Sequence, residues 1–244
     1  MSSIKPGQPW GTEASGPPDF DVVGGDRALA AAIGRGVTDP LVRFAAGSDS
    51  DLARAVGLVA GAASTGVALP LDALTVAASP PSGVRLPEYS GKGTPVQGNS
   101  GSVTVEAVNS VVVGIAPDQL RAWHRPAGLS VEVDGVAVEA ARATSLVVMN
   151  GQYLRGLDLS PRGHPGDGVA EAQLYALPPG ARRAMRSRLA TGAHLPHPGI
   201  TIRRARRIVV RSSSPAALEV DGVPAGRITG LEITLHPAAY RLLV

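Results

Sequence analysis

The stretch FDVVGGDRALAAAI, residues Phe20–Ile33, decides the fold of the N-terminal part of the chain. Phe20–Val23 is a short apolar strand candidate, and the pair Gly24-Gly25 that follows predicts a turn. The run of Ala and Leu from Arg27 to Ile33 favours a helix, because these residues lose little side-chain entropy there. A strand that passes through a glycine turn directly into a helix is typical of an α/β layer.

The same order of elements follows a second time. Leu41–Ala45 is an apolar strand candidate, and GSDSD (Gly47–Asp51) is a polar turn whose Ser and Asp residues can cap a helix. The sequence predicts that helix at Leu52–Val59 and a further strand at Leu69–Ala77. Residues 20–78 therefore predict strand, helix, strand, helix, strand, the alternation of a parallel α/β sheet.

The chain changes character after residue 78. Residues 79–102 contain four Pro, five Gly and five Ser, which is typical of a long loop or linker. Two helical pieces, Pro117–Ala122 and Pro179–Ala190, interrupt a second half that is otherwise β-rich, and Asp134-Gly135 predicts a hairpin turn. We expect an antiparallel β-sandwich. Its predicted strands are Val103–Val105, Ser110–Ile115, Leu129–Val133, Val136–Glu139, Ser145–Asn150, Ala170–Leu177, Ile200–Ile202, Ile208–Ser212, Leu218–Val220 and Leu231–Leu235.

The composition excludes several classes of protein. The 244 residues are 44% hydrophobic, which is enough for one or two cores and argues against general disorder. Without Cys there is no disulfide, thiolate metal site or Cys nucleophile. Residues 1–18 predict a flexible arm rather than a signal peptide, and Ala55–Leu71 is too rich in small residues for a membrane span. We therefore expect a soluble cytoplasmic protein.

The formal charge of +3 is unevenly distributed. Nine of the 23 basic residues are arginines in the acid-free segment Arg182–Arg211, so the remainder has 14 basic and 20 acidic residues and a charge of −6. Such a segment suits phosphate, nucleic acid or an anionic membrane surface, and a solvated arginine-rich face explains it equally well. We expect no nucleic-acid role, because two Trp are too few for a base-stacking platform.

The two glycine-containing turns are candidate anion sites. A glycine turn at the start of a helix presents free backbone N–H groups at the positive end of the helix dipole, and glycine lets a phosphate approach closely. The first turn supplies Gly24, Gly25 and Asp26, and the second supplies Gly47, Ser48 and Asp51. Ordinary structural turns use the same residue types, so this alternative stays open.

The order of the motifs along the chain narrows the choice between an anion site and ordinary structural turns. DVVGGD (Asp21–Asp26) and FAAGSDSDLARAVGL (Phe44–Leu58) are followed by six further motifs. These are VMNGQY (Val148–Tyr153), LSP (Leu159–Pro161), Asp167-Gly168, HLPHP (His194–Pro198), EVDG (Glu219–Gly222) and HPAAYRLLV (His236–Val244). Together they resemble the diacylglycerol kinase and sphingosine kinase family, which carries a Gly-Gly-Asp-Gly-Thr loop, a Gly-Thr-Gly-Asn-Asp-Phe-Ala-Arg segment and similar later motifs. The resemblance covers nearly everything from residue 20 onward.

The resemblance implies a fold and an activity. In that family an α/β domain holds ATP on its Gly-rich loops, and a β-sandwich domain completes a cleft where a lipid hydroxyl is phosphorylated with the help of Mg²⁺. It implies four domains or segments: an arm at 1–18, a truncated α/β domain at 19–78, a loop at 79–102 and a β-sandwich at 103–244 whose last segment may return to the first domain. The residues that it assigns to the nucleotide are Gly24, Gly25, Asp26, Arg27, Gly47, Ser48 and Asp51. It places Asp167 near Mg²⁺, and Asp221 and Asp26 beside the chemistry.

Three departures from the family pattern fall within these motifs. Arg27-Ala28 replaces Gly-Thr after the Gly-Gly-Asp, which puts a side chain where the family's backbone approaches phosphate. Asp49-Ser50 replaces Gly-Asn in the second loop and adds a negative charge there. Val223 stands where the family's Asp-Gly-Glu has its Glu, and a valine cannot accept a proton.

The start of the α/β domain also differs. Only 23 residues precede Gly24, which is too few for the βαβ unit that such kinases place there. We therefore expect a smaller sheet with an edge that a homodimer contact or another partner could cover.

Three interpretations follow. The first is a degenerate, non-catalytic family member that binds lipid or nucleotide in a regulatory role. The second is a divergent but active ATP-dependent lipid kinase that uses Asp26, Asp51 and Asp221 differently. The third is an unrelated structural or interaction protein. A further hypothesis is peripheral membrane contact through the segment Arg182–Arg211, if its arginines form one face.

Overall fold

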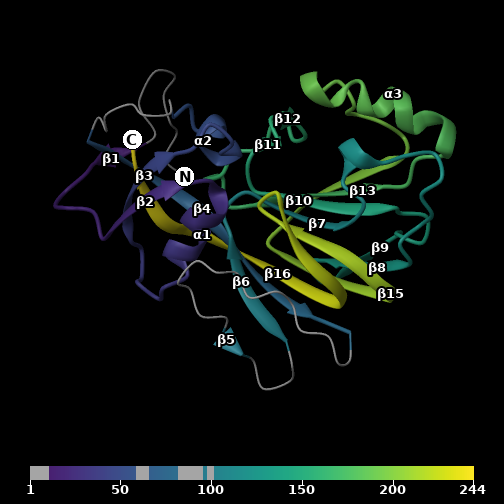
Figure 1. The fold of residues 1–244 in the computed structure, drawn as a ribbon, viewed down its shortest axis with the longest axis horizontal. Coiled ribbons are helices and arrows are strands. Elements are labelled where there is room, and N and C mark those ends of the chain that lie inside the picture. Colours follow the sequence, from purple (N-terminus) through teal and green to yellow (C-terminus); the bar gives the residue numbers. More distant parts are fainter. Residues whose placement is uncertain (1–10, 59–65, 82–95, 98–101) are drawn as a thin grey trace.

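The computed structural model describes residues 11–58, 66–81, 96–97 and 102–244. Figure 1 shows two halves side by side, one with α1, α2 and the C-terminus and the other built almost entirely of strands. The long strands β4 (Val67–Ser79) and β16 (Val223–Leu243) run from one half into the other. The predicted combination of an α/β layer with an antiparallel β-sandwich is therefore confirmed.

The α/β half forms as the sequence predicts in its first four elements. These are β2 (Phe20–Gly24), α1 (Asp26–Ile33), β3 (Leu41–Ala46) and α2 (Asp51–Ala55). β2 and β3 pair in parallel from Phe20↔Val42 to Gly24↔Ala46. The apolar residues of α1 account for its packing, since Leu29, Ala30 and Ala32 are buried against this layer. α2 is shorter than predicted.

The expected third parallel strand is a different one. Leu69–Ala77 lies within β4, which runs antiparallel to β16, whereas the end of β16 pairs in parallel with β3 from Arg241↔Leu41 to Leu243↔Arg43. The last segment therefore returns to the α/β half. The predicted parallel direction of Leu69–Ala77 was wrong, because an apolar run predicts a strand but does not determine which strand it pairs with.

The other half is antiparallel as predicted. In the described residues, fourteen strands form one sheet that folds over itself, and β11 (Tyr153–Leu154) pairs separately with β12 (Leu157–Asp158). The remaining strands of this half are β5 (Val96–Gln97), β6 (Val103–Ala107), β7 (Ser110–Gly114), β8 (Leu129–Val133), β9 (Val136–Val138), β10 (Ser145–Met149), β13 (Ala170–Tyr175), β14 (Ile200–Ala205) and β15 (Arg207–Val220).

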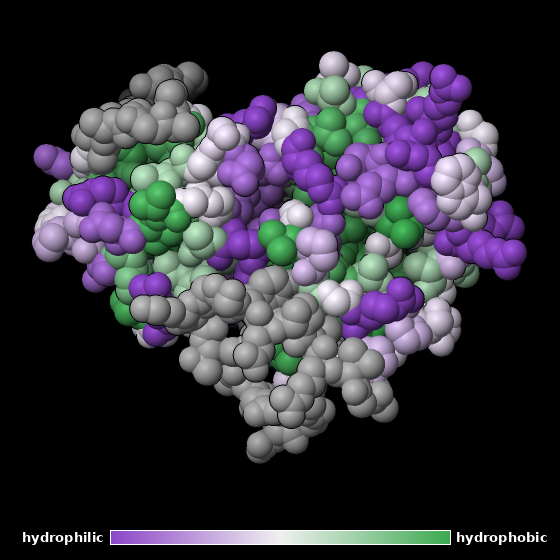
Figure 2. Space-filling model, in the orientation of Figure 1, coloured by the Kyte–Doolittle hydropathy of each residue, from purple (hydrophilic) through white to green (hydrophobic). Residues whose placement is uncertain are grey.

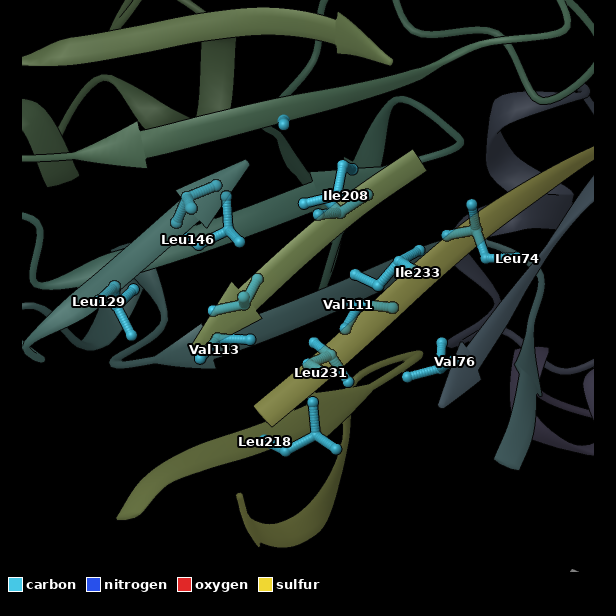
Figure 3. Packing of buried hydrophobic residues seen from close by; sticks show 14 of the residues in the cluster. Leu74, Val76, Val111, Val113, Leu129, Leu146, Ile208, Leu218, Leu231 and Ile233 are labelled. Atoms are coloured by element: carbon cyan, nitrogen blue, oxygen red, sulfur yellow. The ribbon is translucent and has the colours of Figure 1, made fainter. Parts of the chain in front are cut away.

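β15 makes the sheet fold over. Its first part, Ile208–Ser212, pairs with β8, and its last part, Leu218–Val220, pairs with β7, with an irregularity between Arg211 and Ala216. The two layers enclose a core of aliphatic side chains from β4, β7, β8, β10, β15 and β16, which point toward one another in Figure 3. This core is aliphatic because the sequence offers few aromatic residues.

A second core lies on the other face of the strands β7 and β10. Val112 and Val147 face this side while their neighbours Val111 and Val148 face the main core, as the alternation of a strand requires. The 3₁₀ helices η1 (Pro117–Gln119), η2 (Pro179–Ala181) and η3 (Leu189–Thr191) and the short helix α3 (Arg182–Arg186) lie in the segments that cover it. Figure 1 shows α3 at the outer corner of this half.

The two halves are joined more tightly than a linker would join them. Leu74–Ala78 of β4 pairs with β6 of the sandwich, so the boundary expected after residue 78 falls within a strand. β16 has an irregularity between His236 and Tyr240 where it passes between the halves. The carboxylate of Asp72 accepts hydrogen bonds there from the N–H groups of Ala238 at 2.9 Å and Gly168 at 2.7 Å.

Some expectations concern segments that the structure describes only in part. Within the predicted arm, Thr12–Glu13 forms β1 and pairs with β4. Most of the predicted loop 79–102 lies outside the described residues, although Val96–Gln97 forms β5 and pairs with β6. Among the helices of the described residues, none has the length and hydropathy needed to cross a membrane.

Candidate functional site

The two glycine turns meet at one edge of the parallel pair. Gly24 has a φ of +132°, which favours glycine, and the next residue, Gly25, is the N-cap of α1. The N–H of Gly47 donates to the carbonyl of Gly24 at 2.8 Å, which ties the second turn to the first. The carboxyl ends of parallel strands are where ligands of open α/β sheets bind. The two glycine turns therefore lie side by side at this edge.

Asp26 lies between the two helix starts. Its carboxylate accepts a hydrogen bond from Ser50 Oγ at 2.5 Å and one from the N–H of Leu52 at 3.1 Å. Ser50 in turn caps α2 by accepting from the N–H of Ala53 at 3.0 Å. Burial, and next the negative charge of Asp221, raise the pKa of Asp26 to about 7. This carboxyl group is therefore placed to exchange a proton near neutral pH.

Asp221 occupies the turn between β15 and β16, with a φ of +47°. One of its oxygens accepts from the N–H groups of Asn109 at 2.9 Å and Ser110 at 3.0 Å. The other accepts from the N–H of Val108 at 3.1 Å and lies 3.4 Å from Nη1 of Arg27. Burial raises the pKa of Asp221, and Arg27 and the backbone donors oppose that rise. A carboxylate has about four acceptor positions, so all of those of Asp221 are in use.

Arg27 is held by the sandwich half rather than directed toward a phosphate. Its Nη1 donates to the carbonyl of Glu106 at 2.5 Å in addition to the contact with Asp221. This side chain links the first turn of α1 to strand β6 and to the turn between β15 and β16. Arg27 also lines the cleft described below, and its contact with a nucleotide stays a prediction.

Asp51 connects the two halves across the site. Its carboxylate accepts from the N–H of Gly156 at 2.7 Å and from the N–H of Arg155, the two turn residues between β11 and β12. Burial raises the pKa of Asp51, and these two hydrogen bonds oppose that rise. The guanidinium of Arg155 continues the connection by pairing with Asp118 at 2.9 Å and with Glu219. We call these contacts of Asp51 and Arg155 the hairpin clamp.

A cleft of about 670 Å³ lies between these elements. Its volume is within the range of small-molecule sites. Of the sequence-assigned residues, Gly25, Asp26, Arg27, Asp51 and Asp221 line it, whereas Gly24, Gly47 and Ser48 are not among its lining residues. The other lining residues are Ala28, Asp49, Arg54, Arg155, Gly156, Gly222 and Val223.

Asp49 stands between the two turns. A Cβ atom on Gly47 would lie 2.6 Å from its Oδ1, and one on Gly25 would lie 3.6 Å from its Oδ2. The side chain of Asp49 therefore fills the space that the small glycines leave, which is where the family resemblance places phosphates. The added charge that the sequence shows at this position faces both turns.

Asp167 lies elsewhere. Its carboxylate pairs with Arg204 at 2.5 Å, and it is not among the residues that line the cleft. In the described part of the chain, no three His, Asp or Glu side chains are grouped as metal ligands would be. The structure therefore does not bring Asp167 together with Asp26 and Asp221.

Two site residues escaped the sequence reasoning. Arg155 and Gly156 lie 104 and 105 residues from Asp51 in the sequence, so no local pattern could pair them. The positive φ values of Arg155 (+52°) and Gly156 (+73°) are those of a tight hairpin turn, and the Arg-Gly pair was its only sequence signal.

The arginine-rich segment does not form one free face, contrary to the condition set on its membrane role. Arg182 is only 4% exposed, and its side chain donates to the carbonyls of Leu177, Arg121 and His124. Arg204 and Arg207 pair with Asp167 and Glu232. The segment thus divides into arginines that hold loops together and arginines that face solvent.

Comparison with known proteins finds solved structures whose fold is similar to that of this chain. A diacylglycerol kinase from Bacillus anthracis str. Sterne superimposes with a TM-score of 0.62 and 14% sequence identity, over 91% of this chain and 75% of that one. A candidate diacylglycerol kinase from the same strain gives a TM-score of 0.64 at 13% identity, over 91% and 76%. These similarities show the fold. No curated protein sequence matches the chain significantly.

A family model decides the question of membership. Residues 96–244 match the model described as the YegS C-terminal NAD kinase β-sandwich-like domain, which covers more than half of the chain. This match contradicts the interpretation as an unrelated protein. The chain therefore belongs to the family of the YegS C-terminal NAD kinase β-sandwich-like domain, and its fold is similar to that of diacylglycerol kinases.

Proposed function

We propose that this protein is a non-catalytic member of its family, which binds a nucleotide or a lipid head group in the cleft without transferring phosphate. The state of Asp221 carries the proposal. This residue belongs to the segment where the family has Asp-Gly-Glu, yet its carboxylate is held by three backbone N–H groups and Arg27. A general base must direct a free lone pair at the proton that it accepts. Asp221 has none to offer while these contacts hold.

The residue that follows the turn supports the same proposal. Val223 lines the cleft and is 40% exposed, so its side chain reaches the place from which a carboxylate could act. Valine has no proton-accepting group. The two positions of the Asp-Gly-Glu segment therefore supply one saturated carboxylate and one hydrocarbon side chain.

The donor set fits ATP and Mg²⁺ poorly. Asp49 brings a negative charge to the space between the glycine turns. Two like charges 4 Å apart repel each other by about 1 kcal/mol in water and by about 4 kcal/mol at the effective dielectric of a partly buried site. Arg27 and Arg155 already pair with carboxylates and cannot freely compensate. We therefore derive no reaction step through a bound metal or nucleotide.

An active, divergent lipid kinase is the second candidate, and Asp26 favours it. This residue lines the cleft, and its pKa of about 7 suits a group that accepts a proton at neutral pH. Its carboxylate has fewer donors than that of Asp221, since among the residues that the structure describes its hydrogen bonds come from Ser50 and Leu52. A lipid hydroxyl brought into the cleft could thus meet a competent base.

One pair of measurements separates the two candidates. The full chain is incubated with radiolabelled ATP, Mg²⁺ and diacylglycerol in mixed micelles, and its melting temperature is recorded with and without ATP and Mg²⁺. We expect no phosphate transfer above background, together with a rise in melting temperature for whichever of ATP or the lipid occupies the cleft. The D26N variant is compared with D21N, which removes an exposed carboxylate 66% open to solvent.

Transfer that D26N abolishes and D21N retains would overturn the non-catalytic assignment in favour of an active kinase. No change in melting temperature with ATP, with Mg²⁺ or with diacylglycerol would overturn the binding role as well.

The proposed homodimer contact is tested separately, by sedimentation of the wild type. β2 pairs only with β3 in the described residues, and its Val23 is 80% exposed at the free edge.

A further inference from the structure

A tryptophan lies on the surface at the outer corner of the sandwich half. Trp123 follows η1 and is 75% exposed, although large aromatic side chains are rare in this chain. Its loop is a closed turn, because the N–H of His124 donates to the carbonyl of Arg121 at 3.2 Å and the N–H of Arg121 donates to Nδ1 of His124 at 3.0 Å. The indole therefore projects from an ordered part of the surface.

Two arginines of α3 hold this turn in place. Nη1 of the buried Arg182 donates to the carbonyls of Arg121 at 2.8 Å and His124 at 2.7 Å, on either side of Trp123. Arg186 donates through Nη1 to the carbonyl of Leu120. The helix α3 and the tryptophan turn are thus fixed side by side, although about 60 residues separate them in sequence.

The remaining arginines of the two segments face solvent. Arg125, Arg183 and Arg188 are exposed, and together with Trp123 we call them the tryptophan corner. Burial, and next the charges of Arg121 and Arg183, lower the pKa of Arg186, which agrees with a close grouping of guanidinium groups. Figure 2 shows hydrophilic residues gathered over the corner where Figure 1 places α3.

Acidic residues do not neutralise this corner from within its own segments. Residues 119–131 and 176–205 contain no Asp or Glu. Asp118, which precedes the tryptophan turn, already pairs with Arg155 of the hairpin clamp. The corner therefore combines one exposed aromatic side chain with exposed arginines whose own segments carry no acidic residue.

We propose that the tryptophan corner docks the protein on an anionic lipid bilayer. Tryptophan is favoured at the level of the lipid head groups, because its ring is apolar while its N–H can stay hydrogen-bonded. Arginine side chains beside it can bury their methylene groups while their guanidinium groups meet lipid phosphates. Nucleic acid or an acidic protein would also attract the arginines, but neither provides the apolar layer that the exposed indole suits. The proposal does not depend on whether the cleft is catalytic.

The test uses the fluorescence of Trp123 itself. The chain has two tryptophans, so a W10F variant leaves Trp123 as the sole reporter. Vesicles of roughly one-third phosphatidylglycerol and two-thirds phosphatidylcholine are compared with vesicles of phosphatidylcholine alone. We expect a blue shift of the emission, quenching by brominated lipid and co-sedimentation with the anionic vesicles only, all reduced by high salt.

Two variants and a matched control locate the docking surface. R183E/R188E should lower the vesicle partition coefficient by at least about 25-fold, because each arginine near an anionic surface contributes about fivefold. W123S should lower it by about tenfold. R203E/R204E reverses two exposed arginines on β14, away from the corner, and should have a much smaller effect.

Several outcomes would overturn the proposal. One is an unchanged Trp123 emission with anionic vesicles, and another is equal binding to vesicles without phosphatidylglycerol. Binding lost in R203E/R204E but kept in R183E/R188E would move the surface to β14. Retention of a DNA duplex without retention of anionic vesicles would assign the arginines to nucleic acid instead.

Discussion

Two buried carboxylates face each other across the cleft, and their surroundings differ. Asp26 belongs to the glycine turns of the α/β half, and Asp221 belongs to the β15–β16 turn of the sandwich half. Burial is the first cause of a raised pKa in both. Asp26 accepts from one hydroxyl and one N–H group, whereas Asp221 accepts from three N–H groups and a guanidinium. The number of donors therefore differs, and the carboxylate of Asp221 also ties together the backbone of Val108, Asn109 and Ser110.

The comparison shows that the two sides of the cleft hold their carboxylates differently. On the sandwich side of the cleft, the carboxylate of Asp221 is held by hydrogen bonds. On the loop side, the carboxyl group of Asp26 can exchange a proton. A residue retained from a catalytic motif can therefore serve the fold alone, and its role follows from its contacts rather than from the motif. Each prediction below tests one side of this comparison.

The largest expected effect concerns Asp221. D221A leaves three buried N–H groups and the charge of Arg27 without their acceptor, which should lower the free energy of unfolding by about 4 to 5 kcal/mol. D21N, which removes the exposed partner of Arg43, should change it by less than about 0.5 kcal/mol. Urea unfolding of both variants makes the measurement. A loss below about 1 kcal/mol for D221A would show that the turn does not depend on this carboxylate.

Asp26 should give the next largest effect, as a dependence on pH. Its pKa of about 7 in the folded protein exceeds the ordinary pKa of 3.8 for an aspartate, so between these values the folded state holds a proton that the unfolded state has released. Stability contributed by this group is therefore lost as pH rises toward 7. Relative to D26N, which does not titrate, the wild type should lose roughly 2 to 3 kcal/mol of unfolding free energy between pH 5 and pH 8.

Urea unfolding of the wild type and D26N at several pH values measures this difference. Other raised carboxyl groups, such as Asp51 and Glu219, are present in both proteins and largely cancel. A difference between wild type and D26N that stays constant over pH 5 to 8 would show that Asp26 is ionised throughout.

Local sequence signals predicted much of the fold. The hairpin at Asp134-Gly135 is confirmed, with φ values of +47° and +83°, because a tight turn leaves its own residue types in the sequence. The strand Leu129–Val133 was predicted with the observed bounds. The parallel partner of β3 was not, since it comes from the far end of β16 and a periodic pattern does not name the neighbour of a strand.

The site was predictable in its parts but not in its contacts. Asp26 and Asp51, which the sequence assigned to a nucleotide, both line the cleft, because glycine turns before helices have a local signature. The saturation of Asp221 was not foreseeable, since its donors at Val108, Asn109 and Ser110 are more than 100 residues away. Arg182 was predicted to lie on a charged face, because the carbonyls of Arg121 and His124 that it contacts are also distant in the sequence. Nothing in its neighbours shows that carbonyls around Trp123 surround it.

The hairpin clamp should have a smaller effect on stability than Asp221. Gly156 has a φ of +73°, and its N–H donates to Asp51, so G156A imposes backbone strain at the point where the two halves meet. We expect a loss of about 1 to 2 kcal/mol in unfolding free energy. G180A is the matched control, because Gly180 lacks a positive φ and has open space around its Cβ position. Equal free energies of unfolding for G156A and G180A would show that the hairpin clamp does not join the halves.

The smallest expected effect concerns the loop side, at Asp49. Its carboxylate lies beside Gly25 and Gly47, so D49N removes one negative charge from the space between the turns while keeping the size of the side chain. A like charge at about 4 Å in water contributes about 1 kcal/mol, and inorganic phosphate or ATP should therefore bind D49N about fivefold more tightly than the wild type. Titration calorimetry at two salt concentrations measures the change, with D21N as the charge-matched control. Unchanged affinity in D49N would mean that anions do not enter between the glycine turns. The loop side of the cleft would then be closed to a nucleotide. On the sandwich side, the contacts of Asp221 are proposed to prevent catalysis.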